Sequence, residues 1–470
     1  MGIYKFRYAM LLSICGLAMA ATANAQSGTA PAASFSAPSA SFSAPSASFA
    51  APSTSFSTPS QLSLPGGAQS VVSPSYFDTS PVAHGGGGGG GASCGCGTGG
   101  CTTRGCGGGG GLGGITSACN HGDQWQLFGG INENTDYNIG GWFQFGYHTE
   151  SNDLFNSHPD QLNLQQAWLF AEKVATPRDG GGLGWGWRFD AVYGVDGPDT
   201  QAFGNSLNAA GDARGFDNPF DFGAGFGWAI PQLYIEVAGE NWSVKAGHFY
   251  TLIGYEVVTA PDNFFYSHAI TNFNSEPFTH TGAIGTFNVS DDFTLYGGWT
   301  LGWDTGFDQF DDGSAFLGGF STSIADNSSL TYITTIGDFG FRGDDGYNHS
   351  IVVDTQVTDR FNWVVQSDYL RVDGTGEDNI GLNQYFLYSI SDCWGVGSRV
   401  EWWKGDSLTG YAPHGGILPA TGSHSYYAAT FGVNYKPNAN IILRPEYRFD
   451  WSPALGYDEG YFGVDLIALY

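Results

Sequence analysis

Charged side chains recur at every second position along several aromatic-rich segments of this sequence. Arg188 and Asp190 alternate with aromatic residues, and Arg444, Glu446 and Arg448 do so near the C-terminus. Because successive side chains of a strand point to opposite faces, this spacing gathers the charges on one face. Opposed charges across a water-filled space create a transverse field that orders water and sorts solutes by charge. The set comprises Arg188, Asp190, Lys245, Arg399, Glu401, Arg444, Glu446 and Arg448.

A plainer interpretation is that these charges only pair with one another and hydrate the wall that they line. The sequence leaves both interpretations open for each single residue. In either case we expect the charged face as a whole to meet water.

The long link from Tyr250 to His280 is the stronger of two candidates for a loop that narrows such a space. Its aromatic side chains would be costly in open water, so we expect them to pack against the surrounding wall. The weaker candidate is the link from Asp196 to Trp228. The titratable residues of the first loop are Glu256, Asp262, Glu276, His268 and His280, and its large apolar residues are Phe264, Phe265, Tyr266, Phe273 and Phe278.

The last eleven residues, Gly460–Tyr470, indicate what kind of wall this is. Soluble chains rarely end on an apolar strand, because chain ends tend to be solvated. A membrane β-barrel needs such a strand, which pairs with the first strand and leaves no open edge. The apolar face of this segment holds Phe462, Val464, Leu466, Ala468 and Tyr470, and the opposite face holds Gly463, Asp465, Ile467 and Leu469.

Residues 123–470 are therefore predicted to form an all-β, antiparallel transmembrane barrel of about 16 strands, with 14 or 18 as alternatives. Strands of about ten residues, at roughly 3.3 Å each and tilted near 40°, cross an apolar band of about 25 Å. Short links alternate with long ones and precede odd-numbered strands, as expected when the C-terminus is periplasmic. The short links are Ala238–Asn241, Ser290–Asp292, Ala325–Ser329, Thr358–Arg360, Ser391–Cys393 and Lys436–Asn440.

The start of the chain has the features of a secretory signal peptide. Lys5 and Arg7 precede an apolar stretch, and the motif Ala23-Asn24-Ala25 predicts cleavage after residue 25. Cys15, inside the apolar stretch, leaves a lipoprotein as the alternative. Removal of residues 1–25 leaves 14 basic against 44 acidic residues, a net charge of −30. Such a chain is not expected to bind nucleic acid.

Residues 26–122 are predicted to be a disordered tail rather than a domain. A proline in every seventh position excludes a coiled coil, because proline removes a backbone donor and breaks a helix. The Pro/Ser/Ala composition favours an extended linker, followed by a glycine- and cysteine-rich part. The periodic prolines are Pro31, Pro38, Pro45, Pro52 and Pro59.

The cysteines of the tail are candidates for disulfides, the usual state in an oxidising periplasm. Five are an odd number, and Cys393 in a short turn makes six. One hypothesis is that Cys393 tethers the tail to the barrel, and disulfides within the tail or between chains are the alternative. The candidates are Cys94, Cys96, Cys101, Cys106, Cys119 and Cys393. The spacing lacks paired C-x2-C motifs, so it gives only weak support for zinc.

Other chemistry finds little support. The acidic loop Asp304–Gly313 lacks the ligand order of a calcium-binding loop, so a solvated outer loop is favoured. H-E-x-x-H does not occur, and His248 has no serine at a distinctive spacing. We therefore expect neither an enzyme nor a cofactor or metal site.

The segment Gly254–Gly282 resembles the β-barrel porin 2, or OmpL-like, family. Gly254-Tyr255-Glu256, Asn263-Phe264-Phe265-Tyr266-Ser267 and Pro277-Phe278-Thr279-His280-Thr281-Gly282 carry the resemblance. With the signal peptide and the terminal strand, it covers about residues 123–470. The resemblance implies an outer-membrane barrel and a porin, and Tyr470 looks like the signal that the barrel assembly machinery reads. The repetitive tail lies outside the family pattern.

These features predict a porin in the outer membrane of a Gram-negative-type bacterium, with the tail and the C-terminus in the periplasm. Small hydrophilic solutes would cross it passively, with a modest cation preference because acidic residues far outnumber basic ones. Expected partners are outer-membrane lipid, the barrel assembly machinery, the solutes and further copies of the chain. Two alternatives remain, a structural or adhesive barrel with a plugged lumen and a soluble carbohydrate-binding β protein.

Overall fold

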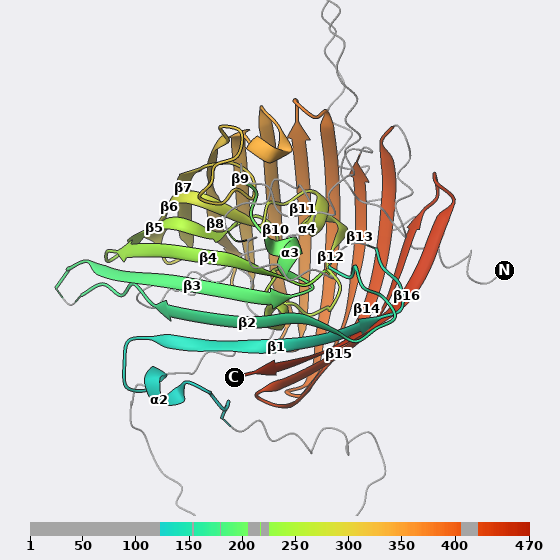
Figure 1. Cartoon of the computed structure of the whole chain (residues 1–470), viewed down its shortest axis with the longest axis horizontal. Coiled ribbons are helices and arrows are strands. Elements are labelled where there is room, and N and C mark those ends of the chain that lie inside the picture. The colour runs from blue at the N-terminus through green and yellow to red at the C-terminus, as the bar shows by residue number, and fades with distance from the viewer. Residues whose placement is uncertain (1–122, 153–154, 179, 205–216, 218–224, 406–421) are drawn as a thin grey trace, which may run out of the picture. The chain divides into compact units, whose positions relative to one another are not determined.

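The computed structural model describes residues 123–152, 155–178, 180–204, 217, 225–405 and 422–470. Sixteen antiparallel strands follow one another in chain order and close into a barrel, which confirms the predicted fold class and strand number (Figure 1). The strands are β1 Asn138–His148, β2 Asn163–Lys173, β3 Gly184–Gly194, β4 Gly227–Ala238, β5 Trp242–Tyr250, β6 Thr279–Ser290, β7 Phe293–Thr300, β8 Ser314–Ala325, β9 Ser328–Asp338, β10 Gly346–Thr358, β11 Phe361–Val372, β12 Glu377–Ser391, β13 Trp394–Gly405, β14 His424–Asn438, β15 Ile441–Ser452 and β16 Tyr457–Leu469.

The predicted signal peptide, the predicted tail and five of the six candidate disulfide cysteines lie outside the described residues. Short helical segments interrupt the links between strands. They are α2 Gly129–Asn132, α3 Gly197–Thr200 and α4 Ile270–Asn274, with the 3-10 turns η3 Ala260–Asp262 and η4 Gly340–Arg342. Within the described residues, no helix is long and apolar enough to cross a membrane.

The barrel closes where the sequence predicted that it would. β1 and β16 pair in antiparallel register, from Trp142 opposite Leu469 to His148 opposite Gly463. Beyond β16, Tyr470 exchanges two backbone hydrogen bonds with Gly141, 2.9 and 3.2 Å long. The first and last strands thus leave no unpaired edge, which is the arrangement that a membrane barrel requires.

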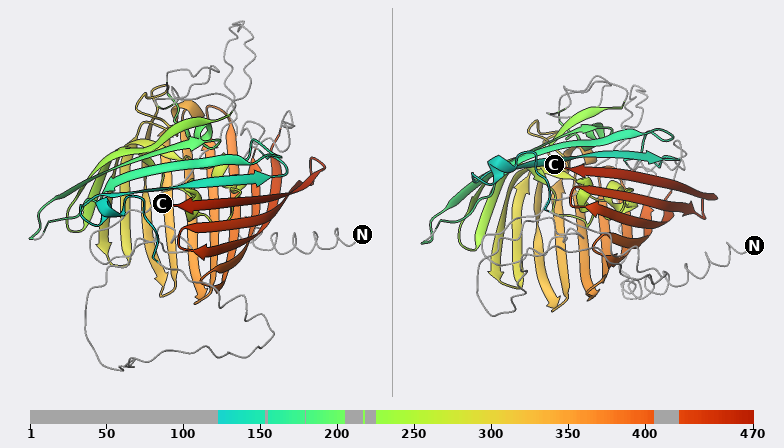
Figure 2. Two further views of the ribbon diagram at one scale, coloured as in Figure 1. Left: turned by 60° about the horizontal axis from the view of Figure 1, so that its bottom comes forward. Right: turned by 90° about the horizontal axis from the view of Figure 1, so that it is seen from below.

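Polar turn residues end the strands at one end of the barrel. The links before β5, β7, β9, β11, β13 and β15 contain two or three residues each and coincide with the six predicted short links. Each of these links contains an Asp or Asn, residues whose side chains suit tight turns. Links of four or more residues lie at the opposite end, whereas the link before β3, residues 174–183, is a longer link on the short-turn side. Both ends of the strand sequence lie on the short-turn side, as an even strand number dictates (Figure 2).

The alternation predicted along each strand separates an outward and an inward face. On β3, Trp185 faces out and is 52% exposed, whereas Asp190 faces in and is fully buried. On β16, Phe462 and Leu466 are exposed while Asp465 and Ile467 are buried. The outward face is apolar, as expected for a wall in contact with lipid, and the inward face carries the polar groups.

Candidate functional site

The candidate site is the segment Thr251–Phe278 between β5 and β6, here called the inserted loop, together with the inner wall that surrounds it. The loop contains η3 and α4, and α4 lies inside the ring of strands in Figure 1. Every residue of α4 is buried. The five large apolar side chains expected to pack against the wall are between 1% and 8% exposed: Phe264, Phe265, Tyr266, Phe273 and Phe278.

Glycines in the wall make room for the side chains of the inserted loop. A Cβ at Gly397 on β13 would lie 2.6 Å from the ring of Phe264, and one at Gly432 on β14 would lie 3.0 Å from the ring of Phe265. Only glycine permits such a close approach. The same relation joins Gly146 and Gly463 to Tyr266, and Gly381 to Thr271. In the sequence these glycines interrupt the alternating pattern of their strands. The residues around them do not indicate that a loop packs against them.

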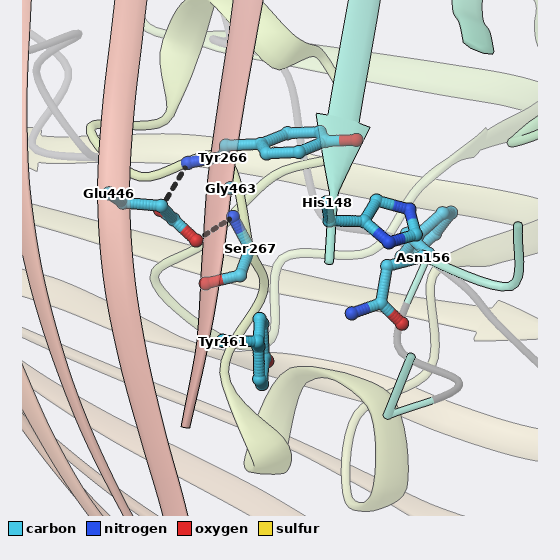
Figure 3. A pocket seen from close by; sticks show the side chains of 8 residues that line it. His148, Asn156, Tyr266, Ser267, Glu446, Tyr461 and Gly463 are labelled. Atoms are coloured by element: carbon cyan, nitrogen blue, oxygen red, sulfur yellow. Dashed lines mark hydrogen bonds between the residues drawn. The ribbon is translucent and has the colours of Figure 1, made fainter. Parts of the chain in front are cut away.

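Two glutamates of the wall bind the backbone of the inserted loop. Glu446 on β15 accepts hydrogen bonds from the N–H groups of Tyr266 and Ser267, at 2.9 and 3.1 Å (Figure 3). Glu401 on β13 accepts one from the N–H of Ile270, the first residue of α4, at 2.7 Å. A carboxylate that accepts from backbone N–H groups forms strong, directional bonds, so these residues fix the path of the loop.

Three arginines of the wall bind the carbonyl groups of the same loop. Arg444 donates to the carbonyl oxygens of Ala260 and Asn263, at 2.7 and 2.6 Å. Arg448 donates to that of His268 at 2.5 Å, and Arg399 to that of Ser267 at 2.7 Å. Donors and acceptors of the wall thus satisfy a non-helical backbone that would otherwise be buried without partners.

Arg399 also joins a carboxylate of the wall to one of the loop. Its guanidinium lies 2.6 Å from Glu256 of the loop and 2.6 Å from Glu401 beside it on β13. Tyr385 and the N–H of Ala269 donate to Glu256 as well, at 3.1 and 2.7 Å. Burial alone would raise the pKa of Glu256, but the Arg399 guanidinium, His268 and the N–H of Ala269 lower it to about 2.

The predicted pore-lining charges lie on the inner wall, but the expectation that they meet water is wrong for most of them. Seven are at most 6% exposed, and the side chain of Arg188 is 14% exposed. The inserted loop covers Arg399, Glu401, Arg444, Glu446 and Arg448 and takes the place of water as their partner. On β3, Arg188 pairs with Asp190 at 2.6 Å and with Glu172 of β2 at 3.0 Å.

Lys245 lies on the same face of β5 but makes a different contact. Its ammonium group is 4.2 Å from the ring centroid of Tyr234, and the side chain is buried. Asp465 on β16, which is not among the predicted pore-lining charges, pairs with Arg444 at 2.5 Å. The alternation on β16 places Asp465 inward, so the same pattern could have identified it.

The other predicted residues of the loop differ in their surroundings. Asp262, in η3, is exposed and accepts a hydrogen bond from Thr259 at 2.6 Å. Glu276 is buried beside the inner wall of β11. His268 lies 3.4 Å from Glu256, whereas His280 belongs to β6 rather than to the link.

The weaker loop candidate, Asp196–Trp228, is only partly within the described residues. Its described start, residues 196–204, includes α3. There Phe203 forms a bridge with Thr305 in the link after β7 and stacks on Phe341 at 3.5 Å. In that later link, Asp304 accepts hydrogen bonds from the N–H groups of Phe278 and Thr279, at 2.5 and 2.9 Å. Asp304 therefore acts here as a structural anchor at the end of the inserted loop.

A small pocket opens where the inserted loop meets the ends of β1 and β16. Glu446, Tyr266 and Ser267 line one side, and His148 and Asn156 face them across it (Figure 3). Nε2 of His148 and Nδ2 of Asn156 have no hydrogen-bond partner there. Phe155, Tyr461 and Gly463 complete the lining. A polar pocket of this kind suits ordered water or the hydroxyl group of a solute.

Cys393 is fully buried at the short turn before β13 and forms a disulfide. The remaining cysteines of the chain lie outside the described residues, so the tether to the tail stays a prediction.

Comparison with protein families matches residues 136–462 to the family described as "Putative beta-barrel porin-2, OmpL-like". Comparison with curated proteins gives no significant match. Among solved structures, the outer membrane channel DcaP of Acinetobacter baumannii has 14% identity and a TM-score of 0.47, with 71% of this chain and 97% of that chain covered. OmpT of Vibrio cholerae has 11% identity and a TM-score of 0.43, with 71% and 97% covered. A mutant of the Rh. blastica porin has 14% identity and a TM-score of 0.45, with 71% and 100% covered.

Proposed function

This chain belongs to the OmpL-like, β-barrel porin-2 family, and from that membership we propose that it is an outer-membrane porin for passive diffusion of small hydrophilic solutes. The observation that carries the proposal is a closed 16-strand barrel whose inserted loop is fixed to the inner wall. A barrel of this size is wide enough for an aqueous channel, and a loop held inside it would set the width of the opening. No catalytic step is part of the proposal.

We further propose a modest preference for cations. The inserted loop contributes Glu256, Asp262 and Glu276 and no lysine or arginine. Glu256 is compensated by Arg399, and Asp262 is the exposed carboxylate of the three. A fixed negative charge beside a narrow passage concentrates cations and repels anions.

The orientation follows from the links. Short turns face the periplasm in transmembrane barrels of this type, and long loops face outward. Both ends of the strand sequence lie on the short-turn side, which supports periplasmic placement of the tail and of Tyr470. Recognition of that terminal strand by the barrel assembly machinery, contact with outer-membrane lipid and association with further copies of the chain belong to the same proposal.

The test is single-channel recording on the full-length mature protein in a planar lipid bilayer under a salt gradient. We expect stepwise conductance and a reversal potential on the cation side. Stepwise conductance with anion preference would leave the porin and remove the proposed selectivity. A correctly folded, heat-modifiable barrel without conductance would exclude the porin.

One observation favours a second candidate, a structural or adhesive barrel with a filled lumen. The loop and the wall bury each other so completely that Arg399, Glu401 and Arg448 are fully buried. In that case the barrel would remain silent in the bilayer, and its long links and tail would bind partners in the envelope. The conductance measurement therefore separates the two candidates directly.

We also propose that Cys393 links the barrel to the N-terminal tail, because it lies at a short turn on the same side of the barrel as the start of β1. Non-reducing peptide mapping of the mature protein would show a cross-linked pair of peptides from the tail and from the turn before β13. Recovery of Cys393 as a free thiol, or in a disulfide between two chains, would remove the tether.

A further inference from the structure

Two carboxylates meet inside the barrel without a basic partner. Glu276 follows α4 at the end of the inserted loop, and Asp368 lies on the inner face of β11. They are 1% and 0% exposed. The amide Nε2 of Gln366 donates to both, to Oδ2 of Asp368 at 2.7 Å and to Oε1 of Glu276. Among the described residues, no ion pair joins either carboxylate to an arginine, lysine or histidine.

Neighbouring residues of the loop and of β10 carry side-chain oxygens that lack a hydrogen-bond donor. Oδ1 of Asp368 has no partner. Asn272 donates through Nδ2 to Glu276 at 3.3 Å, and Asn348 donates to the carbonyl of Ser275 at 2.6 Å. The Oδ1 atoms of both asparagines have no partner, and both side chains are at most 1% exposed. Ser350 lies opposite Asp368 in the register of β10 and β11.

The neighbouring charges do not neutralise the pair. Arg342 faces this region from the link after β9, but it pairs with Glu377 at 3.0 Å and donates to the carbonyl of Asn274. Burial raises the pKa of Glu276 well above its usual range, and the nearby Asp368 and Glu256 raise it further. Two adjacent buried acids therefore either hold protons or share a positive partner.

We propose that Glu276 and Asp368, together with the neutral oxygens of Asn272, Asn348 and Ser350, bind a hard cation of the Ca²⁺ class. Ca²⁺ takes carboxylate, amide and hydroxyl oxygens in a flexible geometry, and two carboxylates balance its charge. The described residues contain no group of three or more acidic, histidine or cysteine side chains placed to hold a metal, so neutral oxygens and water complete the shell. Two protons would neutralise the carboxylates but would leave the amide oxygens without partners.

The position of the site gives the cation a structural role. It joins Glu276, two residues after the end of α4, to the inner face of β11. At Gly254, which has a φ of +96°, a Cβ would collide with the carboxylate of Glu276, so the start of the loop closes over the same place. The cation would tie the beginning and the end of the inserted loop to one strand, whether or not the barrel conducts.

The test is Ca²⁺ titration of the full-length mature protein in detergent, after removal of bound ions with EDTA. Calorimetry should show one Ca²⁺ per chain, and Ca²⁺ should raise the temperature at which the folded form disappears from a gel. Glu276→Gln and Asp368→Asn should each weaken binding at least about tenfold, because each removes a charged ligand. Asp378→Asn, an exposed acid on β12, is the matched control and should bind as the wild type does.

Two results would overturn the proposal. One is Ca²⁺ binding that is equal in the wild type and both variants, which would place the ion elsewhere. The other is a wild type that ignores Ca²⁺ but loses stability as pH rises from 5 to 9, because the carboxyls then hold protons instead. If either acid variant fails to fold, Asn272→Ala removes only a neutral ligand, and unchanged affinity in that variant would also refute the site.

Discussion

The inserted loop meets two unlike walls inside one barrel. Against β5–β9, Leu252 and Ile253 pack in an apolar cluster with Ile284, Leu317 and Ile333. Against β13–β16, the loop backbone is bound by arginine and glutamate side chains, as at Glu446 and Arg444. The start of the loop is therefore held by hydrophobic burial, and its middle by directed polar bonds.

The difference teaches what each wall can specify. Hydrophobic burial is non-directional and tolerates exchange of one aliphatic side chain for another. Charge-assisted hydrogen bonds to backbone groups fix individual residues. The polar wall thus determines which residues of the loop face the passage, while the apolar wall mainly keeps the loop inside the barrel. The two walls should respond differently to substitution and to pH.

The largest effect is expected from Arg399→Ala in the polar wall. The change leaves Glu256 and Glu401 buried without their shared cation, which should lower the free energy of opening the loop by about 3–5 kcal/mol. Hydrogen exchange of amides 255–276 measures that opening. Arg371→Ala, in a pair with Asp373 whose side chains are more than half exposed, is the control and should leave the opening of the loop unchanged, because exposed ion pairs contribute little. Equal effects of the two substitutions on hydrogen exchange would mean that the buried ion pairs of Arg399 do not hold the loop against the wall.

A pH titration should sharpen the same comparison. The pKa of Glu256 is lowered to about 2 in the folded protein, so its contribution is fully present above the ordinary pKa near 4.5. That contribution, up to about 3 kcal/mol, should be lost as pH falls from 4.5 towards 2. Loop exchange in Glu256→Gln should lack this step. Hydrogen exchange at the start of the loop, which is held by apolar contacts, should show no such step with pH. A step at both walls would contradict the distinction between polar and apolar anchoring.

The fold could be predicted because its signals are local. Alternation along β3, β15 and β16 and the polar turns between strands follow from period two and turn chemistry, and they gave the strand number and the closure. The apolar content of the link after β5 also showed that it could not lie in open water.

The partners of the loop could not be predicted in the same way. Glu446 binds Tyr266, 180 positions away, and only the closed barrel brings such residues together. A charged inner face looks the same in sequence whether it meets water or the backbone of a loop, since both demand polar groups. The expectation of a hydrated wall failed for this reason. For glycines such as Gly397, nothing in the sequence indicates that an aromatic ring of the loop packs against them.

Gly397→Ala tests the fit between polar wall and loop without changing a charge. The new methyl group would lie 2.6 Å from the ring of Phe264, so the ring must move, at a cost of about 1–3 kcal/mol. The backbone amides near Phe264 should therefore exchange their hydrogens faster than in the wild type. Gly297→Ala on the outer face of β7 is the matched control, because no atom lies within 4 Å of its Cβ position. Equal rates of hydrogen exchange in both variants would mean that the wall glycines do not provide space that the loop side chains need.

The smallest effect is expected from Ile253→Val in the apolar wall. Ile253 is fully buried, and loss of one methylene should cost about 0.5–1.5 kcal/mol. Because the contact is non-directional, neighbouring side chains can relax, and the effect should not depend on pH between 2 and 5. Ile235→Val, 64% exposed on the outer face of β4, is the control and should leave loop exchange unchanged. An effect as large as that of Arg399→Ala would show that the apolar wall also fixes the position of the loop. The two walls would then differ in the type of contact that they make but not in how precisely they position the loop.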